Sequence, residues 1–95
     1  MNSEEFLPVS ANDLPVTGGV VMVCCPAGLN ARTARIIALV EADNIRRLVE
    51  SRAIFWASDC SNGYLEYLVA VEADPTRRNA LLQRTQERHK TAAIR

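Results

Sequence analysis

Few side chains of this chain could act as nucleophiles or metal ligands. There are three cysteines, Cys24, Cys25 and Cys60, and a single histidine, His89. A zinc site needs clustered Cys, His or carboxylate ligands, and no CxxC spacing occurs. A serine–histidine–aspartate set needs an imidazole beside its nucleophile, whereas His89 lies in a polar, basic C-terminal segment. These residues therefore predict no metal, no cofactor and no catalytic site.

The spacing of one cysteine and one arginine could indicate a phosphate-binding loop. Cys25 precedes Arg32 across a loop that contains Pro and Gly, and this loop superficially resembles the phosphate-cradling loop of the tyrosine phosphatases. In that family the arginine follows one residue sooner, so that its guanidinium reaches the phosphate. Here Pro26 also follows the cysteine directly, and a reactive thiolate needs a cationic, partly exposed setting. We therefore expect a binding protein and no enzyme.

The state of the cysteines follows from their neighbours and from the N-terminus. Cys24 and Cys25 are adjacent, so in a strand they point to opposite faces and cannot easily pair with each other. No basic residue occurs before Arg32, which argues against a signal or transit peptide. We therefore expect a cytoplasmic protein whose reduced cysteines act as small hydrophobes.

The stretch from Gly19 to Arg35 could position a ligand. Its apolar run between Gly19 and Pro26 predicts a buried strand, and Asn30 suits the N-cap of a following helix. A strand that enters a helix through a Gly loop leaves backbone N–H groups free to bind an anion or a carboxylate. The candidate ligand site is therefore Ala27, Gly28, Leu29 and Asn30; the alternative is a plain connection that uses Gly28 for its turn.

The segments after this loop predict further elements. Apolar residues of the segment 30–42 recur with the spacing of one helical stripe, which predicts a helix. The segment 45–58 is ambiguous: its first apolar residues have helical spacing, but its Ile-Phe-Trp content and its place in the element order favour a strand. Asn62 and Gly63 predict a hairpin turn, and residues 64–73 alternate as a strand does.

The last helix is predicted to begin at Asp74-Pro75, with Asp74 as N-cap and Pro75 in the first turn. The resulting order is β-α-β-β-α, with a possible final β-strand near the C-terminus. An antiparallel sheet with both helices on one face satisfies this order, which is the ferredoxin-like two-layer sandwich of the α+β class. We expect residues 1–18 to be a flexible N-terminal arm and residues 19–95 to be a single α+β domain.

A family resemblance follows from short motifs along this order. The chain from Val20 to Gln86 resembles the ACT domain, a ferredoxin-like module that binds amino acids and regulates metabolic enzymes. The resemblance implies a small ligand at the loop 27–30 and a dimer. The matching residues are Pro26, Gly28-Leu29, Ala31-Arg32, Asn44-Ile45, Leu48, Gly63, the stretch YLVAVEADP from Tyr67 to Pro75, and Leu81-Leu82.

Two other resemblances remain open. The run Val20 to Val23, followed by ARIIALVEADN from Ala34 to Asn44, is similar to the coupling proteins of soluble di-iron monooxygenases, which bind and regulate a hydroxylase without a cofactor of their own. Separately, the segment 45–54 resembles the recognition helix of winged-helix proteins, with residues 53–72 as the wing. Arg46, Arg47 and Arg52 would then contact DNA.

Composition limits these alternatives. The net charge is zero, which disfavours nucleic acid as a partner, although the segment 75–95 is rich in arginine and could meet an acidic partner. No apolar run is long enough to span a bilayer. We expect a non-catalytic regulatory protein that binds a small ligand or a larger enzyme partner, and that dimerises through sheet edges or helix faces.

Overall fold

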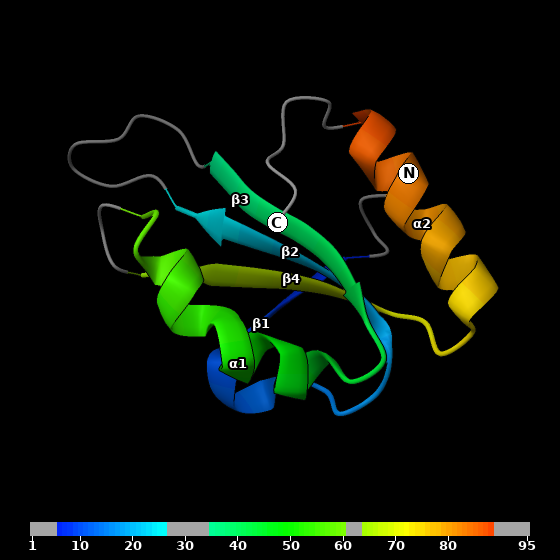
Figure 1. The fold of residues 1–95 in the computed structure, drawn as a ribbon, viewed down its shortest axis with the longest axis horizontal. Helices are drawn as coiled ribbons and strands as arrows, with labels where there is room; N and C mark the ends of the chain where they lie inside the picture. Colours follow the sequence, from blue (N-terminus) through cyan, green and yellow to red (C-terminus); the bar gives the residue numbers. More distant parts are fainter. Residues whose placement is uncertain (1–5, 27–34, 61–63, 89–95) are drawn as a thin grey trace.

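The structure, a computed structural model, describes residues 6–26, 35–60 and 64–88 (Figure 1). Their elements are β1 (Leu7–Val9), the 3-10 helix η2 (Ala11–Asp13), β2 (Gly19–Cys25), β3 (Arg35–Ala42), α1 (Ile45–Ala57), β4 (Glu66–Val71) and α2 (Pro75–Arg88). The strands form one antiparallel sheet in the order β1-β4-β2-β3. The predicted α+β class, with an antiparallel sheet and two helices, is therefore confirmed.

The order of elements differs from the prediction, first at residues 35–42. This segment forms strand β3, which pairs with β2 from Gly19↔Ala42 to Cys25↔Arg35, and the predicted helix is wrong here. A register shift opposite Val23 and Cys24 lets Ile37 and Ala38 share one core cluster, while Leu39 lies in the other. Since this run is buried on two sides, it suits a strand covered on both faces better than a helix with one buried stripe.

Residues 45–57 form helix α1, so the predicted strand is also wrong. Ile45, Val49 and Trp56 are buried on one stripe of the helix, as an amphipathic helix requires. Asn44 is its N-cap, because the Asn44 side-chain oxygen accepts a hydrogen bond from the Arg47 backbone N–H at 3.0 Å. The helical spacing of this segment was the correct signal. Strand β4 and helix α2, by contrast, lie within one or two residues of their predicted ends.

The two helices cover opposite faces of the sheet, as Figure 1 shows. Val21, Val23 and Cys25 of β2 belong to the core cluster that contains the buried residues of α1, whereas Val20, Met22 and Cys24 belong to the cluster that contains Leu81 of α2. The prediction of both helices on one face is therefore wrong. All seven residues of β2 are buried, and a strand that is apolar on both sides needs a cover on each face.

Residues 6–18, before β2, belong to the fold and do not form the flexible arm that was predicted for them. Strand β1 pairs with β4 in the register Leu7↔Val69 to Val9↔Tyr67, and the side chain of Leu14 is only 1% exposed. A chain segment with a paired strand and a buried leucine loses its freedom on folding. Neither helix of the described ranges is long and apolar enough to cross a bilayer.

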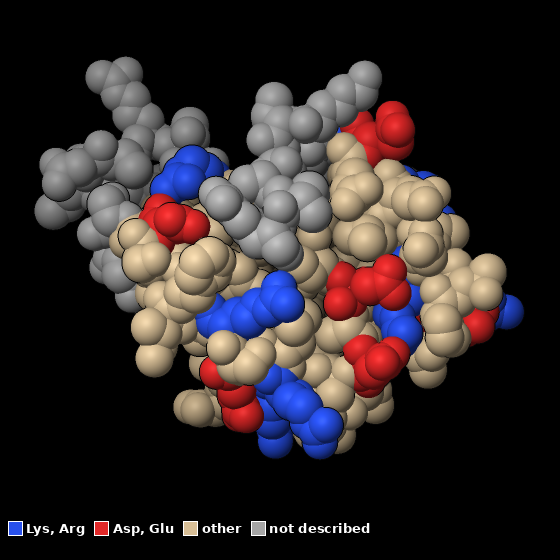
Figure 2. Space-filling view, in the orientation of Figure 1, with Lys and Arg blue, Asp and Glu red and all other residues tan. Residues whose placement is uncertain are grey.

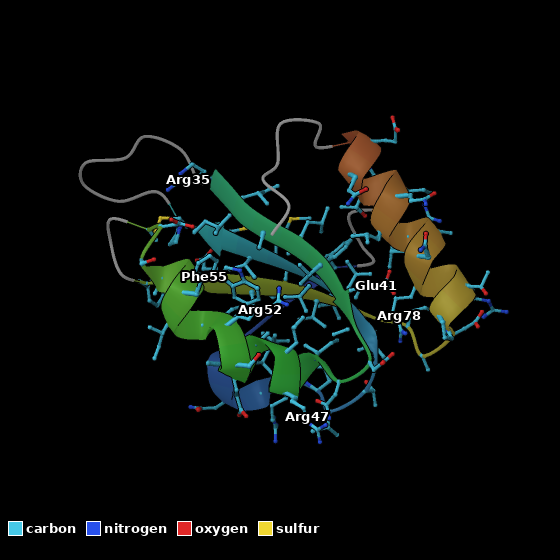
Figure 3. All side chains as sticks on the ribbon, viewed as in Figure 1. Arg35, Glu41, Arg47, Arg52, Phe55 and Arg78 are labelled. Carbon is cyan, nitrogen blue, oxygen red and sulfur yellow. A yellow bond between two sulfur atoms is a disulfide. The ribbon has the colours of Figure 1, made fainter. Side chains whose placement is uncertain are left out.

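A buried arginine fastens α2 to the sheet. Arg78 is 5% exposed, and its guanidinium donates to the Asp43 carboxylate at 2.7 Å and to the Glu41 carboxylate at 3.3 Å. Figure 3 labels Glu41 and Arg78, and Figure 2 shows acidic and basic side chains adjoining where β3 meets α2. A Cβ at Gly18 would overlap the Arg78 guanidinium, so glycine there leaves the space that this arginine fills.

We expect Arg78→Ala to lower the free energy of unfolding by about 2 kcal/mol, because it removes charge-assisted hydrogen bonds and leaves Glu41 half-buried without its partner. The matched control is Arg77→Ala, next in the chain. Arg77 forms only an exposed pair with Asp74 at 3.7 Å, so its loss should change stability by less than about 0.5 kcal/mol. Urea unfolding compares the two variants, and equal midpoints would contradict the assigned role of Arg78.

Candidate functional site

A groove lies between helix α1 and the sheet edge formed by β1 and β4. Its volume is about 700 Å³. It is lined by residues 8–11, by Ala53, Ile54 and Ala57 of α1, and by residues 64–68. Strand β1 pairs with β4 only over residues 67–69, so the groove lies where β1 has turned away from the beginning of β4. We call this hollow the α1–β4 groove.

The walls of the α1–β4 groove carry exposed apolar side chains. Ile54 is 89% exposed and Tyr64 is 63% exposed. Ile54 lies nine positions after Ile45, which at about 100° per residue places it on the side of α1 opposite the buried stripe. A large aliphatic side chain held open on a helix, beside an aromatic side chain on the facing wall, suits contact with another apolar surface.

The N-terminal end of α1 is held by the segment that precedes β2. The backbone N–H groups of Ile45 and Arg46 donate to the carbonyls of Thr17 and Pro15, at 3.0 and 2.9 Å. The Arg46 side-chain Nε donates to the Leu14 carbonyl at 2.9 Å. Because the first N–H groups of α1 are satisfied within the chain, this helix end offers no free donors for an anion. Its role is to set the position of the groove wall.

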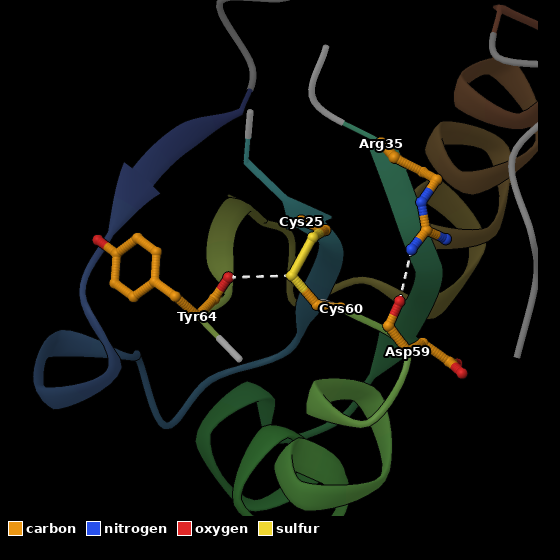
Figure 4. The surroundings of a disulfide bond; sticks show 5 residues. All are labelled: Cys25, Arg35, Asp59, Cys60 and Tyr64. Atoms are coloured by element: carbon orange, nitrogen blue, oxygen red, sulfur yellow. Dashed lines mark hydrogen bonds between the residues drawn. A yellow bond between two sulfur atoms is a disulfide. The ribbon is translucent and has the colours of Figure 1, made fainter. Parts of the chain in front are cut away.

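The C-terminal end of α1 is held by a disulfide between Cys25 and Cys60, whose Cα atoms lie 5.5 Å apart (Figure 4). The prediction that all three cysteines are reduced is therefore wrong for this pair. Cys25 ends β2 and Cys60 follows α1, so the bond depends on an α1 that was not predicted. Cys24 is free and buried on the opposite face, as the alternation of a strand requires.

The α1–β4 groove is lined mainly by apolar side chains. Its side-chain polar groups are the hydroxyls of Ser10, Tyr64 and Tyr67, and its lining holds no basic side chain. Glu66 also lines it, but Glu66 pairs with Cys24 of β2, so its side chain points to the face that α2 covers. Burial raises the pKa of the Tyr67 phenol, so this group stays neutral and can donate a hydrogen bond. Burial, and then the charge of Glu66, raise the pKa of the Cys24 thiol, which makes that thiol a weak nucleophile.

The predicted ligand site lies outside the described residues. The structure describes nothing of Ala27, Gly28, Leu29 and Asn30, so an amino-acid ligand there stays a prediction. Its main physical reason was a helix beginning at Asn30, but the described part of that segment is strand β3. Without a helix over residues 35–42, the expected cluster of free N–H groups loses its support.

The structure places Arg46, Arg47 and Arg52 on one helix but does not bring them into one patch. Arg46 is half-buried and donates to the Leu14 carbonyl, and Arg47 and Arg52 point away from α1 in different directions (Figure 3). The helix that a winged-helix protein would need is present, but residues 53–57 belong to it and cannot form the strand of a wing. The face in Figure 2 shows basic side chains interspersed with acidic and uncharged residues.

Sequence reasoning missed the residues of the α1–β4 groove, above all Ala53, Ile54 and Tyr64. A signal existed for Ile54. If residues 45–57 are drawn as a helix with Asn44 as its cap, Ile54 falls opposite the apolar stripe and becomes an apolar residue in need of a partner. No comparable signal existed for Tyr64, because its wall forms only when β1 pairs with β4.

The described ranges contain no group of three or more His, Cys, Asp or Glu side chains that could hold a metal ion. Comparison with protein-family models, with curated proteins and with solved structures finds no match to this chain.

Proposed function

We propose that this chain is a binding module without catalytic activity, which modulates a partner protein by contact through the α1–β4 groove. The observation that carries the proposal is the 89% exposure of Ile54 on the wall of an apolar hollow. Leaving such a side chain in water gives up the roughly 1.5–3 kcal/mol that its burial could contribute. A partner that covers Ile54 and Tyr64 recovers that free energy.

The occupant that suits this groove is an extended apolar segment of another protein. The side chains of such a segment match the alanine, isoleucine and tyrosine walls. The segment 64–66 precedes the stretch of β4 that pairs with β1, so an extended partner could add beside it as a short strand.

Phage display tests this proposal. A library of random peptides is selected against the immobilised, oxidised chain. We expect the selected peptides to be apolar, and we expect Ile54→Asp to weaken their binding by about tenfold or more, because it buries an unpaired charge. The matched control is Val71→Asp, since Val71 is 61% exposed but does not line the groove; it should bind as the unchanged chain does.

Two outcomes would contradict the proposal. One is a selection that enriches no peptide over Ile54→Asp as bait, and the other is equal weakening by both substitutions. A third measurement separates partner binding from self-association. If a second copy of the chain fills the groove, sedimentation will show a dimer that Ile54→Asp converts to a monomer, and the peptide partner would then be excluded in favour of a homodimer.

A further inference from the structure

The Cys25–Cys60 disulfide lies where both walls of the α1–β4 groove meet. Cys60 is joined to the end of α1 by two backbone hydrogen bonds, Asp59 N–H to Trp56 O at 3.0 Å and Cys60 N–H to Ala57 O at 3.1 Å. The Cys60 Sγ also lies 3.4 Å from the carbonyl oxygen of Tyr64 (Figure 4). Ala57 lines one wall of the groove and Tyr64 lines the other, so Cys60 contacts both walls, Ala57 through its backbone N–H and Tyr64 through its sulfur.

The contact between Cys60 and Tyr64 differs between the two oxidation states. A disulfide sulfur has no proton to donate, so in the oxidised protein this contact is one of packing; only a reduced Cys60 thiol could donate to the carbonyl. What holds Cys60 in place is therefore its bond to Cys25 at the end of β2. The turn is also fixed by Arg35 of β3, whose guanidinium donates to the Asp59 carbonyl.

We propose that the oxidation state of the Cys25–Cys60 pair regulates the α1–β4 groove, with the disulfide form binding the partner segment and the dithiol form binding it weakly. This inference rests on the proposed function of the groove. A dithiol reductant supplies the chemistry. One of its thiolates attacks a sulfur of the pair and displaces the other as a thiolate; its second thiol then closes the reductant's own disulfide. Two electrons and two protons pass to the protein, which gains two cysteine thiols.

The effect of reduction should be local. The N-terminal end of α1 is held independently by Thr17, Pro15 and Leu14, and α2 lies on the opposite face of the sheet. Reduction therefore removes the covalent tie between Cys60 and the end of β2 and loosens the turn after α1 and the segment that begins β4, while Trp56 and the hydrogen bond from Arg35 to Asp59 still hold α1 on the sheet. Cys24 does not compete in the exchange, because it is buried on the other face and the raised pKa of its thiol disfavours the thiolate.

Because the disulfide is buried, a ligand bound in the α1–β4 groove should in turn protect the disulfide from reduction. Cys25 and Cys60 are each 5% exposed, so a reductant reaches them only when the segment around Cys60 opens. A ligand that holds Ala57 and Tyr64 in place opposes that opening, and coupling between two sites acts equally in both directions. A ligand bound in the groove must then stabilise the disulfide over the dithiol by the same factor by which the disulfide strengthens binding of that ligand.

The probe is one peptide selected against the oxidised chain as described above. In the first measurement its affinity is determined by fluorescence anisotropy before and after reduction with dithiothreitol, while circular dichroism reports the fold. We expect binding to weaken by about tenfold or more. In the second measurement the ratio of disulfide to dithiol is determined at equilibrium in mixtures of oxidised and reduced dithiothreitol, with and without saturating peptide; we expect the peptide to shift this equilibrium toward the disulfide by a similar factor, and to have no effect on Ile54→Asp.

The outcomes separate this inference from the function on which it rests. If the oxidised chain binds no peptide, the proposed function fails. If the oxidised chain binds and the folded, reduced chain binds within twofold of it, the regulatory role is overturned while the groove stands. If reduction unfolds the chain, the second measurement decides, because an unchanged equilibrium between disulfide and dithiol in the presence of peptide overturns the coupling.

Discussion

Trp56→Ala is expected to lower the free energy of unfolding by about 3–5 kcal/mol, the range for a large aromatic side chain removed from a core. Trp56 is fully buried, at 0% exposure, and is the largest of the fully buried side chains. It packs in the cluster that joins α1 to β2, β3 and β4. A domain of this size is stabilised by about 5–15 kcal/mol in total, so this variant should be close to unfolding at room temperature. Urea unfolding followed by far-UV circular dichroism measures the loss.

The matched control is Trp56→Phe. Among the described residues the Trp56 Nε1 atom has no hydrogen-bond partner, and a buried unpaired donor costs about 1–3 kcal/mol. Phenylalanine removes that donor but keeps most of the ring, so part of the packing loss is offset. We expect Trp56→Phe to cost less than half as much as Trp56→Ala. If both variants lose the same stability, the indole ring is not packed as the structure shows.

Removal of the disulfide by the double substitution Cys25→Ala/Cys60→Ala is expected to cost about 4 kcal/mol. The two cysteines are 35 residues apart, and the loop-closure model assigns about this much entropy to a cross-link of that span. The bond acts mainly by restricting the unfolded chain, so the loss should appear even if the folded structure barely changes. Urea midpoints of the oxidised chain and of the double variant measure it under the same buffer.

Cys24→Ala is the control for the disulfide prediction. It also deletes a buried sulfur, but it leaves the bond between Cys25 and Cys60 intact. Its cost should be that of a small cavity, about 1 kcal/mol. Dithiothreitol should destabilise the unchanged chain and Cys24→Ala by the same amount, and should not destabilise the double variant. A loss below about 1 kcal/mol in the double variant would contradict a structural disulfide.

These two predictions concern the same part of the molecule as the proposed function. Trp56 and Cys60 both hold the C-terminal half of α1 against the sheet, and Ile54 and Ala57 of that half line the α1–β4 groove. A binding surface is most effective when its walls are held rigid before the partner arrives. The core beneath the groove therefore contributes to stability and to the pre-organisation of the groove.

Local patterns were sufficient for three elements. The apolar run ending at Cys25 predicts β2, the alternation after Tyr64 predicts β4, and the Asp74-Pro75 pair predicts the start of α2. In each case the signal depends on neighbours along the chain. The α+β class and the antiparallel sheet followed from these signals, because a small number of elements can bury their apolar sides in only a few arrangements.

Local patterns were insufficient where two signals competed. Residues 35–42 have helical spacing but form β3, and residues 45–57 were assigned to a strand by element order but form α1. For the second segment the local signal, the helical spacing of its first apolar residues, was right. The error came from imposing an alternating order on it. For β3 the deciding fact was tertiary, since its apolar run lies between two layers.

The sequence by itself therefore determined the fold class, three of the elements and the absence of any obvious catalytic motif. Only the tertiary structure decided the placement of helices on opposite faces, the pairing of Cys25 with Cys60 and the position of the α1–β4 groove. The physical reason is the range of the interactions. Caps and turns act over a few residues, whereas a disulfide across 35 residues and a groove walled by β1, α1 and β4 exist only after the chain has packed.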